Sequence, residues 1–90
     1  MIEYQVVLTK KAKKELFKLD KYDRAILAAW IEKNLVNCTD PRAHEKMLTG
    51  NLAGKWRYRV GNFRILADIK DKLLTIYVIN IGHRKDIYDF

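Results

Sequence analysis

Arginines at alternate positions are the residues of this chain best suited to chemistry. Arg57 and Arg59 alternate with apolar residues, and the pair Gly61-Asn62 separates them from Arg64 in a second alternating run. Gly-Asn suits a two-residue hairpin loop, so Arg59 should pair with Arg64. Directly paired residues project to the same side of a sheet, so all three arginines are predicted to share one face. Guanidinium donors fit phosphate oxygens and stay charged at any working pH, which indicates an anion site with several phosphate contacts.

The end of the chain adds groups that the hairpin lacks. His83 carries an imidazole that can accept or donate a proton, Arg84 can hold a phosphate while charge builds on it, and Tyr88 can donate a proton or stack on a base. The last predicted strand runs back beside the second strand of the hairpin and should deliver these residues, with Lys85, close to its turn. Each alone has an ordinary explanation, but together they favour a functional site over a solvated basic face.

Length and composition limit what this sequence can be. Ninety residues allow a single domain, 1–90, and 18 lysines and arginines against 11 acidic residues give a net charge of +7. Such an excess of cations favours an anionic partner, either nucleic acid or an acidic protein surface. Cys38 is the only cysteine, which excludes an internal disulfide. The sequence shows no signal peptide or apolar span, so we expect a cytoplasmic protein that does not enter a membrane.

Hydrophobic periodicity supplies the elements that must position these residues. Thr9 is expected to cap a helix whose outer face is lysine-rich. Trp30, Trp56 and Phe17 occupy core spacings. The order β-α-α-β-β-β predicts an α+β fold in which a two-helix hairpin packs on one face of a mainly antiparallel four-stranded sheet. Besides the capped helix, we expect a strand at 2–8, a helix at about 23–36, a β-hairpin at 56–69 with its turn at 61–62, and a strand at 73–81.

Two stretches resemble a known family. Residues 55–66 contain a basic alternating strand and a Gly-x-aromatic-Arg hairpin, and residues 77–88 end in Gly-His-Arg-Lys-x-Ile-Tyr. Both resemble the RelE/ParE superfamily of type II toxin–antitoxin toxins, and the likeness covers essentially the whole chain. The resemblance implies a RelE-like fold and a toxin that a cognate antitoxin holds inactive.

The RelE branch of this superfamily implies an enzyme. Its members are ribosome-dependent endoribonucleases that cut messenger RNA in the decoding A site, and the reaction needs no metal or other cofactor. The ribose 2′-OH attacks the adjacent phosphorus and leaves a 2′,3′-cyclic phosphate and a 5′-hydroxyl. The branch often has lysine where this chain has Arg57, Arg59 and His83; arginine is a poor general base, whereas His83 could serve. The resemblance implies catalytic roles for Arg64, Arg84, Tyr88 and His83, and RNA-binding roles for Lys55, Arg57, Arg59 and Lys85.

The implied partners are a RelB-like antitoxin, the ribosome and messenger RNA. The toxin–antitoxin complex is also expected to bind its own operator DNA through the antitoxin. Two alternatives remain: a ParE-like toxin that inhibits DNA gyrase by binding it, and a simple nucleic-acid-binding regulator. A gyrase inhibitor would not need basic side chains gathered around a phosphate. A simple regulator would give the residues at the end of the chain no function.

Overall fold

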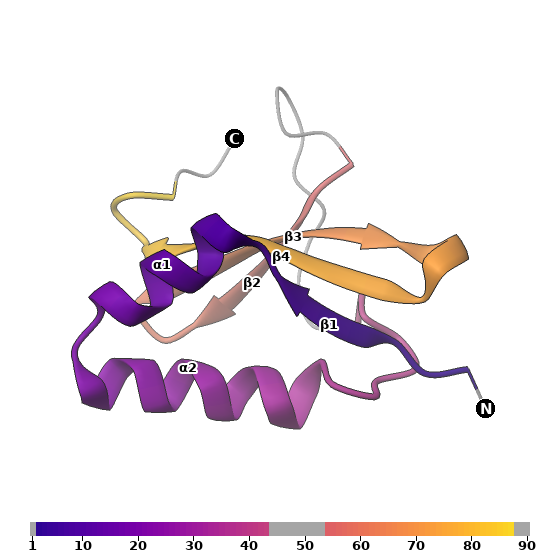
Figure 1. Ribbon diagram of the computed structural model, residues 1–90, viewed down its shortest axis with the longest axis horizontal. Helices are drawn as coiled ribbons and strands as arrows, with labels where there is room; N and C mark the ends of the chain where they lie inside the picture. The colour runs from indigo at the N-terminus through magenta and orange to yellow at the C-terminus, as the bar shows by residue number, and fades with distance from the viewer. Residues whose placement is uncertain (1, 44–53, 88–90) are drawn as a thin grey trace.

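A four-stranded sheet with two helices over one of its faces forms the domain (Figure 1). The computed structural model describes residues 2–43 and 54–87. The strands lie in the order β1-β4-β3-β2; β1 runs parallel to β4, and the other neighbours are antiparallel. The predicted element order and mainly antiparallel sheet are therefore confirmed. The elements are β1 (Gln5–Leu8), α1 (Lys10–Lys18), α2 (Lys21–Asn34), β2 (Trp56–Val60), β3 (Phe63–Lys70), the 3₁₀ turn η2 (Asp71–Leu73) and β4 (Thr75–His83).

Side-chain caps determine where both helices begin. The Thr9 hydroxyl accepts a hydrogen bond from the backbone N–H of Ala12 at 3.2 Å, as the sequence predicts. The Asp20 carboxylate accepts one from the N–H of Asp23 at 2.8 Å. Because Asp20 caps it, α2 begins at Lys21 and not at the predicted residue 23.

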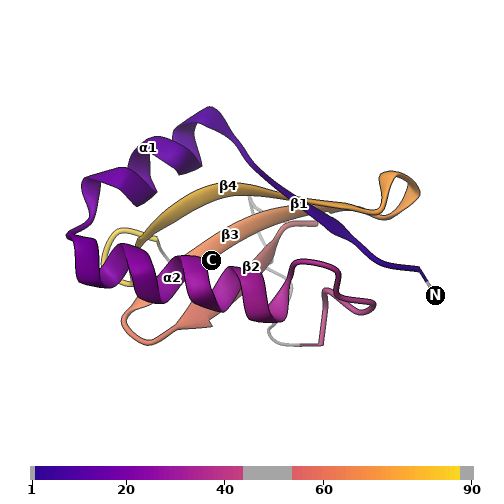
Figure 2. The ribbon, with the colours of Figure 1, turned by 60° about the horizontal axis from the view of Figure 1, so that its bottom comes forward.

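The core lies between the helices and one face of the sheet (Figure 2). Leu16 of α1 and Leu27 and Ile31 of α2 are buried there against strand residues that include Tyr58 and Ile65. Trp30 and Trp56 pack against the same cluster, as predicted. Within the described residues, no helix combines the length and the apolar character that crossing a membrane requires.

Phe17 departs from its predicted place in the core. Its side chain is 66% exposed, and the guanidinium carbon of Arg24 lies 5.3 Å from the centre of its ring. Ala12 and Leu16 define the buried stripe of α1, and Phe17 projects about 100° away from Leu16 around the helix. The prediction that Phe17 is a core residue is therefore wrong.

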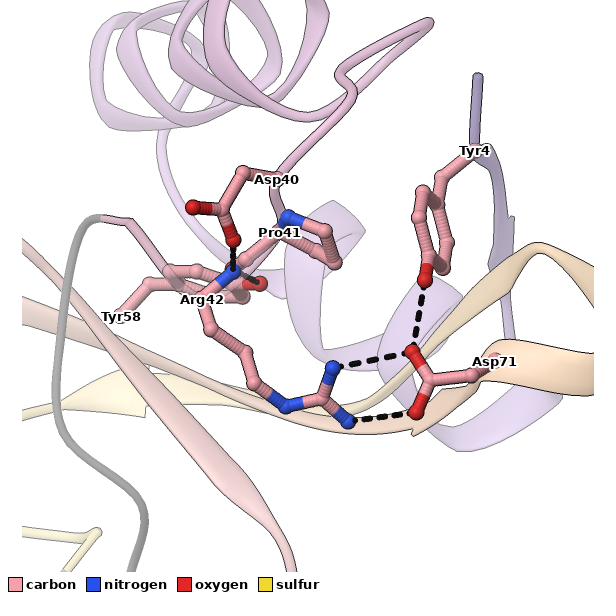
Figure 3. A network of polar contacts seen from close by, with 6 residues as sticks. All are labelled: Tyr4, Asp40, Pro41, Arg42, Tyr58 and Asp71. Carbon is pink, nitrogen blue, oxygen red and sulfur yellow. Dashed lines mark hydrogen bonds and ion pairs between the residues drawn. The ribbon is translucent and has the colours of Figure 1, made fainter. Parts of the chain in front are cut away.

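A polar network fastens the segment after α2 to the sheet (Figure 3). Arg42 forms a two-pronged ion pair with Asp71, with Nη1–Oδ1 and Nη2–Oδ2 distances of 2.9 and 3.0 Å. The Tyr4 hydroxyl donates to the same Asp71 carboxylate at 2.6 Å. The buried Tyr58 hydroxyl donates to the carbonyl of Pro41, one residue before Arg42. This network joins the start of β1, the β3–β4 connection and the chain that follows α2.

Replacing Asp71 by Asn should lower the thermal stability in a pH-dependent way. The hydrogen bond from Arg42, followed by that from Tyr4, holds the pKa of the Asp71 carboxyl below its ordinary value of 3.8. Its stabilisation is therefore complete above pH 3.8 and is lost as the pH falls further. We expect Asp71→Asn to lower Tm by a few degrees at pH 7, since an exposed pair contributes at most about 1 kcal/mol.

The measurement is thermal unfolding as a function of pH. The difference between parent and variant should shrink below pH 3.8, and Glu32→Gln on the exposed side of α2 serves as the control. An unchanged Tm at pH 7 would show that the network does not stabilise the fold.

Candidate functional site

The hairpin of β2 and β3 places three arginines on one face of the sheet. Gly61 adopts φ 58° in a two-residue turn, as the first central residue of a type II′ turn does. Arg59 is then paired with Arg64, and Arg57 with Leu66. The predicted register is confirmed, and Arg57, Arg59 and Arg64 share the face that points away from the helices. We call this surface the arginine face.

The three arginines differ in how deeply they are set. Arg57 is only 9% exposed, Arg59 is exposed, and Arg64 is half-buried beside the turn. The Arg64 Nη1 donates to the carbonyls of Gly61 and Phe63 at 3.1 and 2.9 Å. These bonds hold one edge of the Arg64 guanidinium against the turn of the hairpin.

Lys55 lies at the other end of the hairpin, next to an acidic residue. Asp68 interacts with the Nζ atoms of Lys55 and Lys70 at 3.2 and 3.3 Å. Burial acts to raise the pKa of the Asp68 carboxyl, but the hydrogen bonds from both lysines bring it below its ordinary value. Lys55, a predicted RNA-binding residue, is thus part of an ion-pair cluster at the start of β2.

The end of β4 reaches the turn of the hairpin. Gly82 pairs with Arg64, and the backbone N–H of Arg84 donates to the carbonyl of Asn62 at 2.8 Å. Arg84 and Lys85 are exposed in the turn that follows. The prediction that the last strand delivers these two residues to the turn end of the hairpin is therefore confirmed.

Gly82 lets the chain fold back onto the arginine face. Because it pairs directly with Arg64, a side chain at this position would point to the same side of the sheet. A Cβ there would lie 3.4 Å from both Cγ1 and Cδ1 of Ile87, which is itself buried. Ile87 thus anchors the end of the chain beside Arg64. Tyr88, the next residue, lies outside the described residues.

His83 lies on the opposite side of the sheet from the arginines. It pairs with Phe63 on the helix side, with ring centres 5.8 Å apart and an edge-to-face geometry. Burial and Asp20 raise the pKa of the Asp23 carboxyl, whereas His83 acts to lower it, which places the imidazole near the start of α2. The prediction that His83 joins the arginines in one site is therefore wrong.

A β-bulge is the reason for this reversal. Leu66 pairs with Asn80 whereas Ala67 pairs with Val78, so Ile79 is an extra residue in β4. Without the bulge, strict alternation from Thr75 would place His83 on the arginine face. The bulge shifts the alternation by one residue and turns Gly82, not His83, to that face.

Glu15, which the sequence pattern did not single out, holds this bulge from α1. Its Oε2 accepts from the Nδ2 of Asn80 and its Oε1 from the backbone N–H of Ile81, both at 2.9 Å. The one available signal was that Glu15 is the only acidic residue in a lysine-rich helix.

Comparison with known proteins places the chain among the toxins of type II toxin–antitoxin systems. Residues 6–88 match the family model described as "ParE toxin of type II toxin-antitoxin system, parDE". Toxin RelG of Mycobacterium tuberculosis is 35% identical over 86 residues, which cover 94% of this chain and 95% of that protein.

Solved structures show the same fold. The crystal structure of the toxin–antitoxin complex RelBE2 of M. tuberculosis contains a chain that is 30% identical, with a TM-score of 0.84; the match covers 93% of this chain and 94% of that one. The isolated RelE toxin of E. coli superposes with a TM-score of 0.71 at 20% identity, over 89% of this chain and 83% of that one. The second likeness shows the fold alone.

Substituting Gly82 should detach the end of the chain. The Cβ of Ala at this position makes a contact that Ile87 can accommodate, but the larger side chain of Val would occupy the place of Ile87. We expect Gly82→Val to increase amide hydrogen exchange at Asp86 and Ile87 by at least tenfold, with a small change in Tm. Gly82→Ala is the matched control. Unchanged exchange in Gly82→Val would mean that Ile87 does not anchor the chain end.

Proposed function

Because the chain belongs to the RelE/ParE superfamily of type II toxin–antitoxin toxins, we propose that it is a messenger RNA endoribonuclease that acts on the ribosome and inhibits translation. The arginine face is the proposed cleavage site. Arg64 and Arg84 would stabilise the scissile phosphate, with Arg57, Arg59 and Lys85 holding the RNA around it. Lys55, at the start of β2, is the outermost of the proposed RNA contacts.

The single observation that supports this assignment best is the direct pairing of Arg59 with Arg64. Like charges opposite one another in a sheet lower its stability. A phosphate bound between them reverses this effect, because guanidinium groups donate charge-assisted hydrogen bonds to its oxygens. The backbone bond from Arg84 to Asn62 brings a further cation to the same end of the hairpin.

The proposed reaction is an in-line displacement within the RNA. The 2′-oxygen loses its proton and bonds to the adjacent phosphorus, and the bond from phosphorus to the 5′-oxygen breaks. The departing 5′-oxygen takes up a proton, so the products are a 2′,3′-cyclic phosphate and a 5′-hydroxyl. Arg64 and Arg84 would neutralise the charge that grows on the phosphoryl oxygens, and the ribosome would hold the RNA in line.

The position of His83 changes the catalytic role expected for this residue. Its imidazole contacts Phe63 on the helix side, and its Nδ1 accepts from the N–H of Lys85 at 3.3 Å. We therefore assign the rate enhancement to charge stabilisation and positioning and give His83 no part in proton transfer. Tyr88 keeps the role that the family resemblance implies for it, which is to stack on the nucleotide or help to activate it.

An antitoxin is the proposed regulatory partner. The relative in the RelBE2 structure is part of a toxin–antitoxin complex, and an acidic antitoxin segment would complement the net charge of +7. By covering the arginine face, such a segment would exclude RNA from the site. The complex would bind operator DNA through the antitoxin.

Inhibition of DNA gyrase is the second candidate function. The matching family model carries the ParE description, and members of that branch act by binding gyrase. Mapping messenger RNA ends after brief expression separates the two, because cuts within codons occur only with the nuclease. A gyrase inhibitor would instead reduce supercoiling and leave transcripts intact.

Arg64→Ala should abolish growth arrest and lower messenger RNA cleavage by about 10²–10³-fold, because one preorganised donor to the transition state is lost. Its fold and its antitoxin binding should remain. Cleavage in a ribosome-based assay and thermal unfolding are the measurements, and Lys33→Ala on the exposed side of α2 is the control. Full toxicity of Arg64→Ala would remove the proposed mechanism.

His83→Gln tests whether the imidazole takes part in proton transfer. Because His83 lies on the helix side of the sheet, the pH dependence of the single-turnover cleavage rate should match that of the parent. Loss of an inflection near the pKa of a histidine would show that His83 titrates in the reaction.

A further inference from the structure

The outer surface of α1 is almost wholly cationic. Its exposed lysines are Lys10, Lys11, Lys13, Lys14 and Lys18. Within the part of the chain that the structure describes, none of them forms an ion pair. Like charges three or four residues apart destabilise a helix, so the stability of α1 does not account for this arrangement.

The one carboxylate of α1 is bound to β4 and forms no ion pair with these lysines in the described part of the chain. Glu15 is turned toward β4, where its two oxygens accept from Asn80 and from the backbone of Ile81. An open groove of about 480 Å³ runs beside it, lined by Lys10, Lys11, Lys14, Glu15 and Lys18. Four lysine side chains and Glu15 therefore border a space large enough for a phosphate group.

An aromatic ring is exposed among these lysines. Phe17 follows Lys13 and Lys14 by four and three residues, so the three side chains are neighbours on the helix surface. The ring is 66% exposed, and the Arg24 guanidinium lies 5.3 Å from its centre. The Arg24 guanidinium thus lies over one face of an exposed ring that is bordered by lysines, and we call this pair the platform.

We propose that this surface of α1, with Phe17 and Arg24, is a second RNA-binding site that takes a single-stranded segment. The lysines contact the phosphates and an unpaired base stacks on the platform. Single-stranded nucleic acids are bound by this combination of basic groups and exposed aromatic rings. Protein interfaces are depleted of lysine, which disfavours a protein partner for a surface of this composition.

This site is separate from the arginine face. α1 packs on the helix side of the sheet, whereas Arg57, Arg59 and Arg64 point away from it. The inference rests on the proposed function only for the choice of RNA as the polyanion. Because binding here does not require cleavage, the two proposals can fail independently.

The test measures binding of a short fluorescent oligouridylate to the Arg64→Ala chain, which leaves the arginine face impaired in every sample. The double variant Lys10→Gln/Lys14→Gln should bind the RNA about tenfold more weakly. The slope of the logarithm of the binding constant against the logarithm of the salt concentration should fall by about 0.7 for each lysine removed. Lys33→Gln/Lys72→Gln removes the same charge from exposed positions elsewhere and should have little effect. Thermal unfolding verifies that all variants are folded.

Phe17 tests the stacking component. Phe17→Leu keeps an apolar side chain but removes the ring, and should weaken binding about fivefold or more, whereas Phe17→Trp should preserve it. Equal losses in the two lysine pairs, or unchanged binding in Phe17→Leu, would overturn the proposal. The proposal would also be overturned if these variants lost binding only to an acidic amphipathic peptide, tested in parallel, because this result would identify a protein interface. Failure of messenger RNA cleavage in the parent would leave this result intact.

Discussion

The direct cross-strand pairing of two cations, Arg59 and Arg64, is the constraint on which the proposed site depends. The two-residue turn at Gly61-Asn62 fixes this pairing, because a slip of one residue would exchange the two faces of a strand. Tyr58 and Ile65, which are paired in the same register, would then leave the core. Burial of these apolar side chains therefore holds the arginines together against their repulsion, and the core and the site are set by one register.

The second constraint is the bulge at Ile79. β4 pairs with β3 over its whole length, so its alternation decides what reaches the arginine face from the end of the chain. Because of the extra residue, Gly82 and not His83 lies on that face. The lack of a side chain at Gly82 makes room for Ile87. Glu15 satisfies the backbone N–H of Ile81 just after the bulge, where β4 has passed the end of β1. The Glu15 carboxylate of α1 thus helps to determine which residues lie on the arginine face, on the other side of the sheet.

Features governed by local patterns could be predicted from the sequence. The alternation around Gly61-Asn62 gave the hairpin register, and Thr9 marked the start of α1. The position of His83 could not be predicted, because a bulge in an apolar strand leaves no periodic signal and depends on a partner 66 residues away in α1. Phe17 was misassigned because hydrophobicity alone does not distinguish an exposed ring from a buried one. The Arg42–Asp71 pair joins two loops, and loops carry no periodicity that would relate them.

The two cationic surfaces are built from different residues, and their chemistry differs accordingly. The arginine face consists of short-range, oriented donors on a rigid hairpin, where Arg64 is already held by two carbonyls. Such preorganisation suits the stabilisation of one developing charge. The α1 surface carries flexible lysines, whose attraction for phosphates is sensitive to salt and tolerant of geometry, which suits capture of a strand rather than catalysis. Glu15 connects the two: it lies among the lysines of α1, and its bonds to β4 fix the strand that brings Ile87 to Arg64.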